Sequence, residues 1–228
     1  MSNAAPPEEE TPFMPRRAAL SPPLTRRLAL LSFGALALLP AWPAHAALSP
    51  DDQADIQRIQ NYLNSIRSLA SRFDQVADDG GIASGMIYLQ RPGHMRIEYD
   101  QPSRIVMVAT KGEIYYYDGK LDQVSWVDID ETPAWFLLQN DIRIGGDIQV
   151  LNLQRDPGVL KLTLTETKRA ARGKVTLALN DQPLELRQWS VIDAQNKTVT
   201  VTLADPHYGV SIDPQKFVWS DPREDSSR

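Results

Sequence analysis

The chain has 228 residues, a formal net charge of −5 and no cysteine. Without cysteine it can form no disulfide, no thiolate metal site and no lipid-modified N-terminal cysteine, and its three histidines match no H-E-x-x-H or H-x-x-x-H spacing. The acidic balance, without a long run of Lys or Arg, argues against nucleic acid and anionic membrane surfaces as partners. We therefore expect a soluble protein with no metal and no cofactor.

The N-terminal region has the pattern of a secretory signal peptide. Arg26 and Arg27 precede an uncharged run over residues 28–39, which is shorter than the roughly 20 residues that a membrane-spanning helix needs. The sequence A-H-A that ends at Ala46 then offers a signal-peptidase site. We expect residues 1–46 to be removed on export. The arginine pair only loosely resembles a twin-arginine signal, so general secretion is the expected route.

The boundaries of the mature protein follow from this cleavage site. Residues 1–13 are acidic and proline-rich, whereas Met14 begins a basic stretch, so Met14 is a candidate for the true start. The removed segment holds three Glu and four Arg, which leaves residues 47–228 one charge unit more acidic than the whole chain. That length suits a single domain with a substantial core.

Residues 49–66 have the pattern of an amphipathic helix. Ser49 can cap the helix, Pro50 fits its first position, and Asp51 and Asp52 suit the positive end of the helix dipole. Apolar residues then recur every three or four positions, at Ile56, Ile59, Leu63 and Ile66. The helix is expected to lie on an apolar surface.

From Leu69 onward the apolar period changes to two, and turn signals such as D-D-G-G, R-P-G-H and D-G-K arrive about every ten residues. The pattern predicts roughly ten or eleven strands. Their connections are too short for parallel crossovers, so the sheet should be an antiparallel, strongly curved meander. In residues 105–108, Ile105 and Met107 alternate with Val106 and Val108, so both faces of the strand are apolar and the two-residue period does not tell which one faces inward. The same period places Tyr116 on the opposite face from Tyr115 and Tyr117.

One helical segment interrupts the strands. Asp130, Glu131 and Thr132 precede Pro133 in the manner of a capped helix start, and W-F-L-L follows at residues 135–138. A short helix this apolar must cover an apolar concavity, which could be a closed core or a cavity. Trp126, Trp189 and Trp219, by contrast, are interpreted as ordinary core residues.

The order of these blocks resembles the periplasmic outer-membrane lipoprotein carrier family, LolA. The resemblance covers most of residues 50–221 and rests on the leading helix, F-D-Q, the R-P-G-x-M-R block, K-G-E-I-Y-Y-Y-D, the T-P helix and the closing I-D-P-Q-K-F. In that family an unclosed antiparallel barrel is covered by helices on its concave apolar face. The resemblance implies a chaperone that shields the acyl chains of lipoproteins and carries them from the inner to the outer membrane.

The resemblance also implies roles for particular residues. Arg91 would hydrogen-bond the backbone of the lid helix and hold it shut. Met95, where the family often has Phe, and Ile97, where Trp is common, would line the cavity together with Tyr99. The lid helix, residues 133–139, would add the apolar side chains of Trp135, Phe136 and Leu138.

The implied partners are acylated lipoproteins, an inner-membrane ATP-driven lipoprotein release complex and an outer-membrane acceptor, with the carrier itself a monomer. A second possibility is a periplasmic carrier or sensor of another lipid on the same scaffold, because fold does not decide the ligand. A third is a lipid hydrolase, but G-I-A-S-G at residues 81–85 is not the G-x-S-x-G of a nucleophile elbow. We therefore expect a protein that is not an enzyme.

Overall fold

A computed structural model describes residues 48–132 and 135–225 of the chain. The expected signal peptide, residues 1–46, and Pro133 of the expected lid lie outside the described residues. In the described part of the chain, no helix is both long and apolar enough to cross a membrane, and no group of His, Asp and Glu is placed to hold a metal ion.

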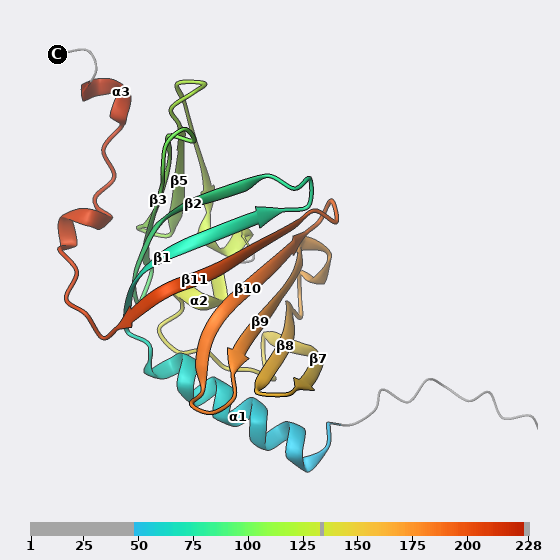
Figure 1. Cartoon of the computed structure of the whole chain (residues 1–228). Helices are drawn as coiled ribbons and strands as arrows, with labels where there is room; N and C mark the ends of the chain where they lie inside the picture. The colour runs from blue at the N-terminus through green and yellow to red at the C-terminus, as the bar shows by residue number, and fades with distance from the viewer. Residues whose placement is uncertain (1–47, 133–134, 226–228) are drawn as a thin grey trace, which may run out of the picture. The chain divides into compact units, whose positions relative to one another are not determined.

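Within the residues that the structure describes, eleven antiparallel strands form one curved sheet (Figure 1). Their order across the sheet is β6-β5-β4-β3-β2-β1-β11-β10-β9-β8-β7, so β6 and β7 are its two edges and the barrel is not closed. The predicted fold class is confirmed. The strands are β1 (Ser68–Ala77), β2 (Ile82–Gln90), β3 (His94–Tyr99), β4 (Ile105–Thr110), β5 (Glu113–Asp118), β6 (Gln123–Asp128), β7 (Ile148–Asp156), β8 (Val159–Glu166), β9 (Gly173–Asn180), β10 (Glu185–Asp193) and β11 (Thr198–Tyr208).

The first helix, α1 (Pro50–Ser65), begins as its sequence predicts. Ser49 accepts a hydrogen bond from the Asp52 amide, and Asp52 accepts one from the Ser49 amide, which completes a capping box. Ile56, Ile59 and Leu63 are buried on one face of the helix. Figure 1 shows α1 passing beneath the ends of β9 and β10, so the helix covers one end of the curved sheet.

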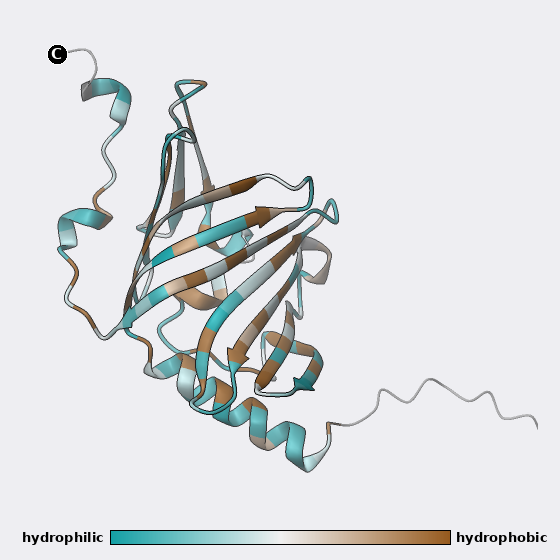
Figure 2. Cartoon of the chain, in the orientation of Figure 1, coloured by the Kyte–Doolittle hydropathy of each residue, from teal (hydrophilic) through white to brown (hydrophobic). Residues whose placement is uncertain are grey.

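The predicted second helix differs from the observed one. A 3₁₀ turn, η1 (Ile129–Glu131), comes first, and the Thr132 hydroxyl donates to the Ile129 carbonyl. Among the described residues, the α-helix that follows, α2, comprises Trp135–Leu138. Figure 2 shows α2 as a hydrophobic segment within the curve of the sheet.

The segment after β11 returns along the convex side of β3–β5. It contains η3 (Pro214–Phe217) and α3 (Pro222–Asp225), while a further 3₁₀ turn, η2 (Ala170–Arg172), precedes β9. The Lys216 ammonium contacts Glu98 at 3.3 Å and lies 4.6 Å from the centre of the Tyr88 ring. Trp219 stacks on Tyr115 with 5.0 Å between ring centres. These contacts fasten the returning segment to the outside of the sheet.

The concave face of the sheet is filled in one half and hollow in the other. Buried Leu and Val side chains of β8 and β9 join Ile59 of α1 and Phe136 of α2 in one apolar cluster. Over β2–β6 the side chains instead surround a cavity. The two alternatives that the sequence left open, closed core and cavity, are therefore both present, side by side.

Candidate functional site

The cavity has a volume of about 360 Å³ and an almost wholly apolar wall. Strands β2–β6 supply one side, β10 supplies Leu186, Trp189 and Val191, and the ends are closed by the last turn of α1 and by Leu137 of α2. Among the described residues that line the wall, Arg91 alone is charged. A pocket of this kind can take up an apolar chain and offers it few polar partners.

Strand register explains why these side chains face inward together. Ile87 pairs with Ile97, Ile97 with Met107, Met107 with Tyr116, and Tyr116 with Ser125, so one row crosses five strands. All five residues of this row line the cavity. Directly paired residues in adjacent strands point to the same face of a sheet. Met107, and not Val106 or Val108, therefore lies on the cavity side of β4.

The sequence-predicted residues of β3 divide into two groups. Met95 and Ile97 line the cavity. Tyr99 lies beyond the cavity wall, where its ring meets the edge of Phe73 at 5.2 Å between ring centres and its hydroxyl donates to Gln75 at 2.7 Å. Burial, with a further contribution from Tyr116, raises the pKa of Tyr99 to about 12. Tyr99 is thus a neutral packing residue beside the cavity.

The residues of α2 do not all face the cavity. Leu137 lines it, whereas Trp135 and Phe136 line a smaller pocket against β8 and β9, and Leu138 is buried. Successive residues of a helix point about 100° apart, so four consecutive apolar residues cannot share one face. The structure therefore places Leu137 on the main cavity in place of the three side chains named from the sequence. Thr132 touches both pockets, so α2 lies between them.

Arg91 lies at the centre of a set of backbone carbonyls. Its side chain is buried, with 7% of the residue exposed. Its Nη1 donates to the carbonyls of Leu63 at 2.6 Å and Ile66 at 3.2 Å, and its Nε donates to that of Gln139 at 2.7 Å. Longer contacts of 3.3 and 3.4 Å reach the Asn64 side chain and the Asn140 carbonyl. One guanidinium thus connects the end of β2 with the end of α1 and with the segment that follows α2.

Burial lowers the pKa of Arg91, and nearby Arg67 lowers it further while Asp141 opposes the shift. Since a guanidinium starts above 12, Arg91 stays charged at neutral pH. A buried charge needs compensating hydrogen bonds, and here the carbonyl dipoles at a helix C-terminus provide them. Breaking any of these bonds without a replacement costs more than for a neutral donor.

Sequence reasoning missed the residues that hold the segment after α2. Asn64 donates to the carbonyl of Ile142 and accepts from its amide, both within 2.9 Å. Gln60 accepts from the Ile144 amide at 2.7 Å. The periodicity assigned both side chains to the polar side of α1. An amide side chain offers a donor and an acceptor like a peptide group, but nothing in the sequence pattern indicates which backbone it meets.

The tryptophans interpreted as core differ from one another. Trp189 is half-buried and lines the cavity, and Trp219 stacks on the convex face. Trp126 pairs with Tyr115 and is 64% exposed, which makes the core interpretation wrong for this residue. The signal that could have found Trp189 is its alternation with Val191, since both face the same side of β10.

The chain matches a known family over most of its length. Residues 64–220 match the family model described as "Outer membrane lipoprotein carrier protein LolA". An outer-membrane lipoprotein carrier protein of Pseudomonas aeruginosa is 26% identical over 205 residues, which cover 86% of this chain and 96% of that protein. The corresponding protein of Methylococcus capsulatus is 27% identical over 175 residues, 72% of this chain and 83% of that one. The resemblance found in the sequence is confirmed.

Two further relatives complete the comparison. An uncharacterized protein of Rickettsia prowazekii is 27% identical over 130 residues, so the match spans 57% of this chain and 61% of that protein. The crystal structure of a LolA superfamily protein from Nitrosomonas europaea aligns with a TM-score of 0.42 at 11% identity, and the alignment covers 72% of this chain and 97% of that one.

Proposed function

Because the chain belongs to the LolA family of outer-membrane lipoprotein carrier proteins, we propose that it shields the acyl chains of lipoproteins in its apolar cavity and carries them across the periplasm. The relatives named as outer-membrane lipoprotein carriers support a carrier that binds lipoproteins. We propose that the direction of this transport is from the inner to the outer membrane. Carriers of this family are not enzymes.

The observation that carries the proposal is the cavity itself. Its wall is continuous apolar surface from five neighbouring strands. The charged group of the wall, the Arg91 guanidinium, already donates hydrogen bonds to backbone carbonyls. Each acyl methylene kept from water is worth about 0.8 kcal/mol, so a chain of ordinary length needs such a shelter to cross an aqueous space. Non-directional apolar contacts suit this task because they hold different acyl chains alike.

The size of the cavity implies that it must open. About 360 Å³ is near the lower end of ligand pockets, which begin at roughly 300 Å³, and several acyl chains need more. We propose that α2 and the segment after it move as the lid, because α2 lies between the cavity and the second, smaller pocket and Ile142 of the following segment lines the cavity. The Arg91 bond to Gln139 would then break on loading, and Arg91 would act as the lid latch.

The remaining parts of the proposal concern place and partners. The signal-peptide pattern of residues 1–46 and the relatives named as outer-membrane lipoprotein carriers both support the periplasm. We propose that a monomer receives cargo from an inner-membrane ATP-driven release complex and passes it to an outer-membrane acceptor.

The hydrolase alternative has no support at Ser84. Its hydroxyl donates to the Asp74 carboxylate at 2.6 Å, and the ring of His94 contacts the Pro92 carbonyl. The partner of Ser84 is thus a carboxylate, which is a weaker base than the imidazole that usually receives the proton of a serine nucleophile, and such a nucleophile also needs a set of donors for the oxyanion. A carrier of another lipid remains the second candidate function. Identification of the bound ligand distinguishes it from a lipoprotein carrier.

The experiment compares two neighbouring positions of β4. Met107→Asp places a charge on the cavity wall, whereas Val106→Asp places the same charge on the opposite face of the same strand, and both side chains are half-buried. We expect binding of a synthetic triacylated lipopeptide to fall at least ten-fold in Met107→Asp and to change little in Val106→Asp, with folding of both checked by circular dichroism. Equal binding by both variants would refute the cavity as the acyl site.

A further inference from the structure

The two edge strands of the sheet, β6 and β7, differ in how well they are protected from pairing with another strand. At the β7 edge the pairing with β8 shifts register between Val150 and Asn152, a bulge that leaves Leu151 without a partner in the ladder. Ile144 bridges to Ile148 at the start of the same strand, and Arg155 near its end is bonded to Asp52 and Asp55 of α1. Proteins usually protect an edge strand from pairing with another chain by a β-bulge, by a segment that covers the edge, or by charged side chains that are bonded to a neighbouring element.

The β6 edge carries none of these protections in the described part of the chain. Its six residues pair with β5 in unbroken register from Gln123 to Asp128. Four of the six are exposed, and Trp126 is 64% exposed. Alternate residues of an edge strand direct their N–H and C=O groups away from the sheet. Within the described residues, no further strand pairs with this edge.

The open edge also borders the cavity. Ser125 and Val127 of β6 line the cavity wall, where they continue the rows that begin at Ile87 and Leu89. Strand β6 is therefore both the edge of the sheet and the border of the proposed acyl-binding surface. A molecule with its apolar part in the cavity and its polar part outside would pass along β6.

We propose that β6 pairs with the extended peptide that follows the acylated N-terminal residue of the cargo, so that this peptide adds a twelfth strand to the sheet. The inference rests on the proposed function, since it assigns a place to the protein part of the same ligand. A lipoprotein carries its acyl chains at its N-terminus, so its first residues must leave the cavity where the chains enter. A strand of six residues spans about 20 Å, which matches a short linker.

Main-chain pairing suits a carrier of many cargos. The hydrogen bonds of an added strand come from the peptide backbone, which is the same in every cargo, and side chains contribute only where pockets exist. Asp118, Asp122 and Asp128 lie at the two ends of this edge and outnumber the one cation of the β5–β6 turn, Lys120, so a neutral or basic linker is favoured over an acidic one. The exposed Trp126 ring offers one apolar contact beside the added strand.

The test uses one lipopeptide in three forms. The unmodified triacylated hexapeptide is compared with two versions in which backbone amides are N-methylated, either at even or at odd positions. Only alternate amides of a strand face its partner. We expect one methylated series to bind about ten-fold more weakly and the other to bind like the unmodified peptide. Hydrogen exchange should slow at alternate amides of Gln123–Asp128 on binding, with Ile148–Asp156 of the β7 edge unchanged as the internal control.

Each other outcome has a definite meaning. If no form of the lipopeptide binds, the proposed function fails. If all three bind alike, or both methylated series lose affinity equally, the cargo is bound without pairing to β6 and the inference is overturned. A concentration-dependent dimer that protects the same amides without lipopeptide would assign the edge to a second copy of the chain and would overturn it as well.

Discussion

Arg91 shows how one side chain can connect three segments. Its guanidinium has donors in a fixed planar fork, and the structure directs them to carbonyls at the end of α1 and after α2. Only the bond to Gln139, with the weaker contact to Asn140, would be given up if the lid moved. A charged hydrogen bond of this kind contributes about 1.5 to 3 kcal/mol. A latch of this strength would limit the affinity for acyl chains and would still allow the lid to open.

Replacement of Arg91 should therefore favour loading over release. Arg91→Leu removes the energy that opening must supply, so affinity for acyl chains should rise about ten- to a hundred-fold, and delivery to acceptor membranes should slow. Arg72→Leu is the control, because Arg72 is an exposed residue of β1 paired with Asp100. The measurement is transfer of a labelled lipoprotein between purified membranes. An Arg91→Leu protein that loads and delivers like the wild type would show that Arg91 only supports the fold.

Gly85 is required by the close approach of β2 to its neighbours. A Cβ added there would lie 2.1 Å from the Glu98 carbonyl oxygen and 2.8 Å from the Phe73 ring, so the backbone would have to move. We expect Gly85→Ala to lower the free energy of unfolding by about 1 to 3 kcal/mol, the usual cost of overpacking. Gly146→Ala, where a Cβ meets nothing within 4 Å, should be nearly neutral. Equal urea midpoints for the two variants would contradict this account of Gly85.

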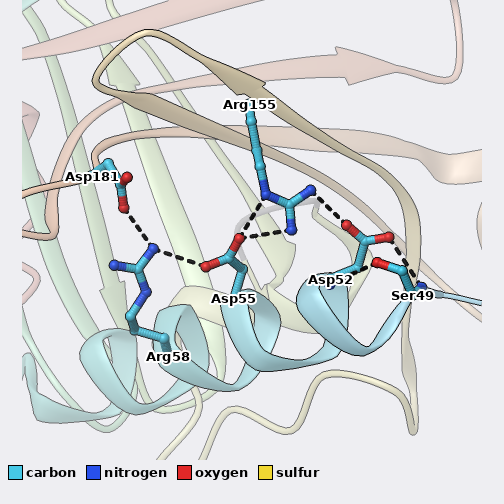
Figure 3. Close-up of polar contacts among 6 residues, drawn as sticks. All are labelled: Ser49, Asp52, Asp55, Arg58, Arg155 and Asp181. Carbon is cyan, nitrogen blue, oxygen red and sulfur yellow. Dashed lines mark hydrogen bonds and ion pairs between the residues drawn. The ribbon is translucent and has the colours of Figure 1, made fainter.

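At the scale of elements, α1 is held at both ends. Arg91 and the side chains of Gln60 and Asn64 fasten its C-terminal half to the segment after α2. Figure 3 shows the N-terminal half, where Arg155 of β7 bonds Asp52 and Asp55, and Arg58 bonds Asp55 and Asp181. Exposed ion pairs contribute little singly, but here they form a connected row. The helix is thereby fixed across the end of the sheet.

The ion-pair row should make α1 sensitive to acid. The hydrogen bond from Arg155, with further bonds from Ser49, lowers the pKa of Asp52. A carboxyl whose pKa is lowered by folding stabilises the fold above its ordinary pKa of about 4, and the contribution is lost as the pH falls through the lowered value. Arg155→Gln should therefore destabilise the protein at pH 7 but much less at pH 3.

Urea unfolding of wild type and variant at the two pH values measures this difference. Arg187→Gln is the control, because Arg187 pairs only weakly, at 3.5 Å, with Glu185 of its own strand. If the effect of Arg155→Gln were the same at pH 3 and pH 7, the Asp52 carboxylate would not be the partner that matters.

At the scale of the whole molecule, local signals predicted the fold and long-range pairing decided the site. The capping box at Ser49 and the short turns between strands are encoded within a few residues, so the helix start and the antiparallel meander could be predicted. Which face of β4 meets the cavity depends on its register with β3 and β5, which period alone does not contain. The roles of Leu137, Gln60 and Asn64 likewise depend on segments distant in the chain. Arg91 was found only through a family resemblance.

One measurement tests the central claim, that the hollow half of the sheet holds the acyl chains of lipoproteins. The protein is purified from the periplasm of its native host without detergent, and native mass spectrometry identifies what remains bound to wild type and to Met107→Asp. We expect a one-to-one complex with acylated lipoproteins in the wild type and its loss in the variant. A bound glycolipid or isoprenoid without protein, or the same cargo on both proteins, would contradict it.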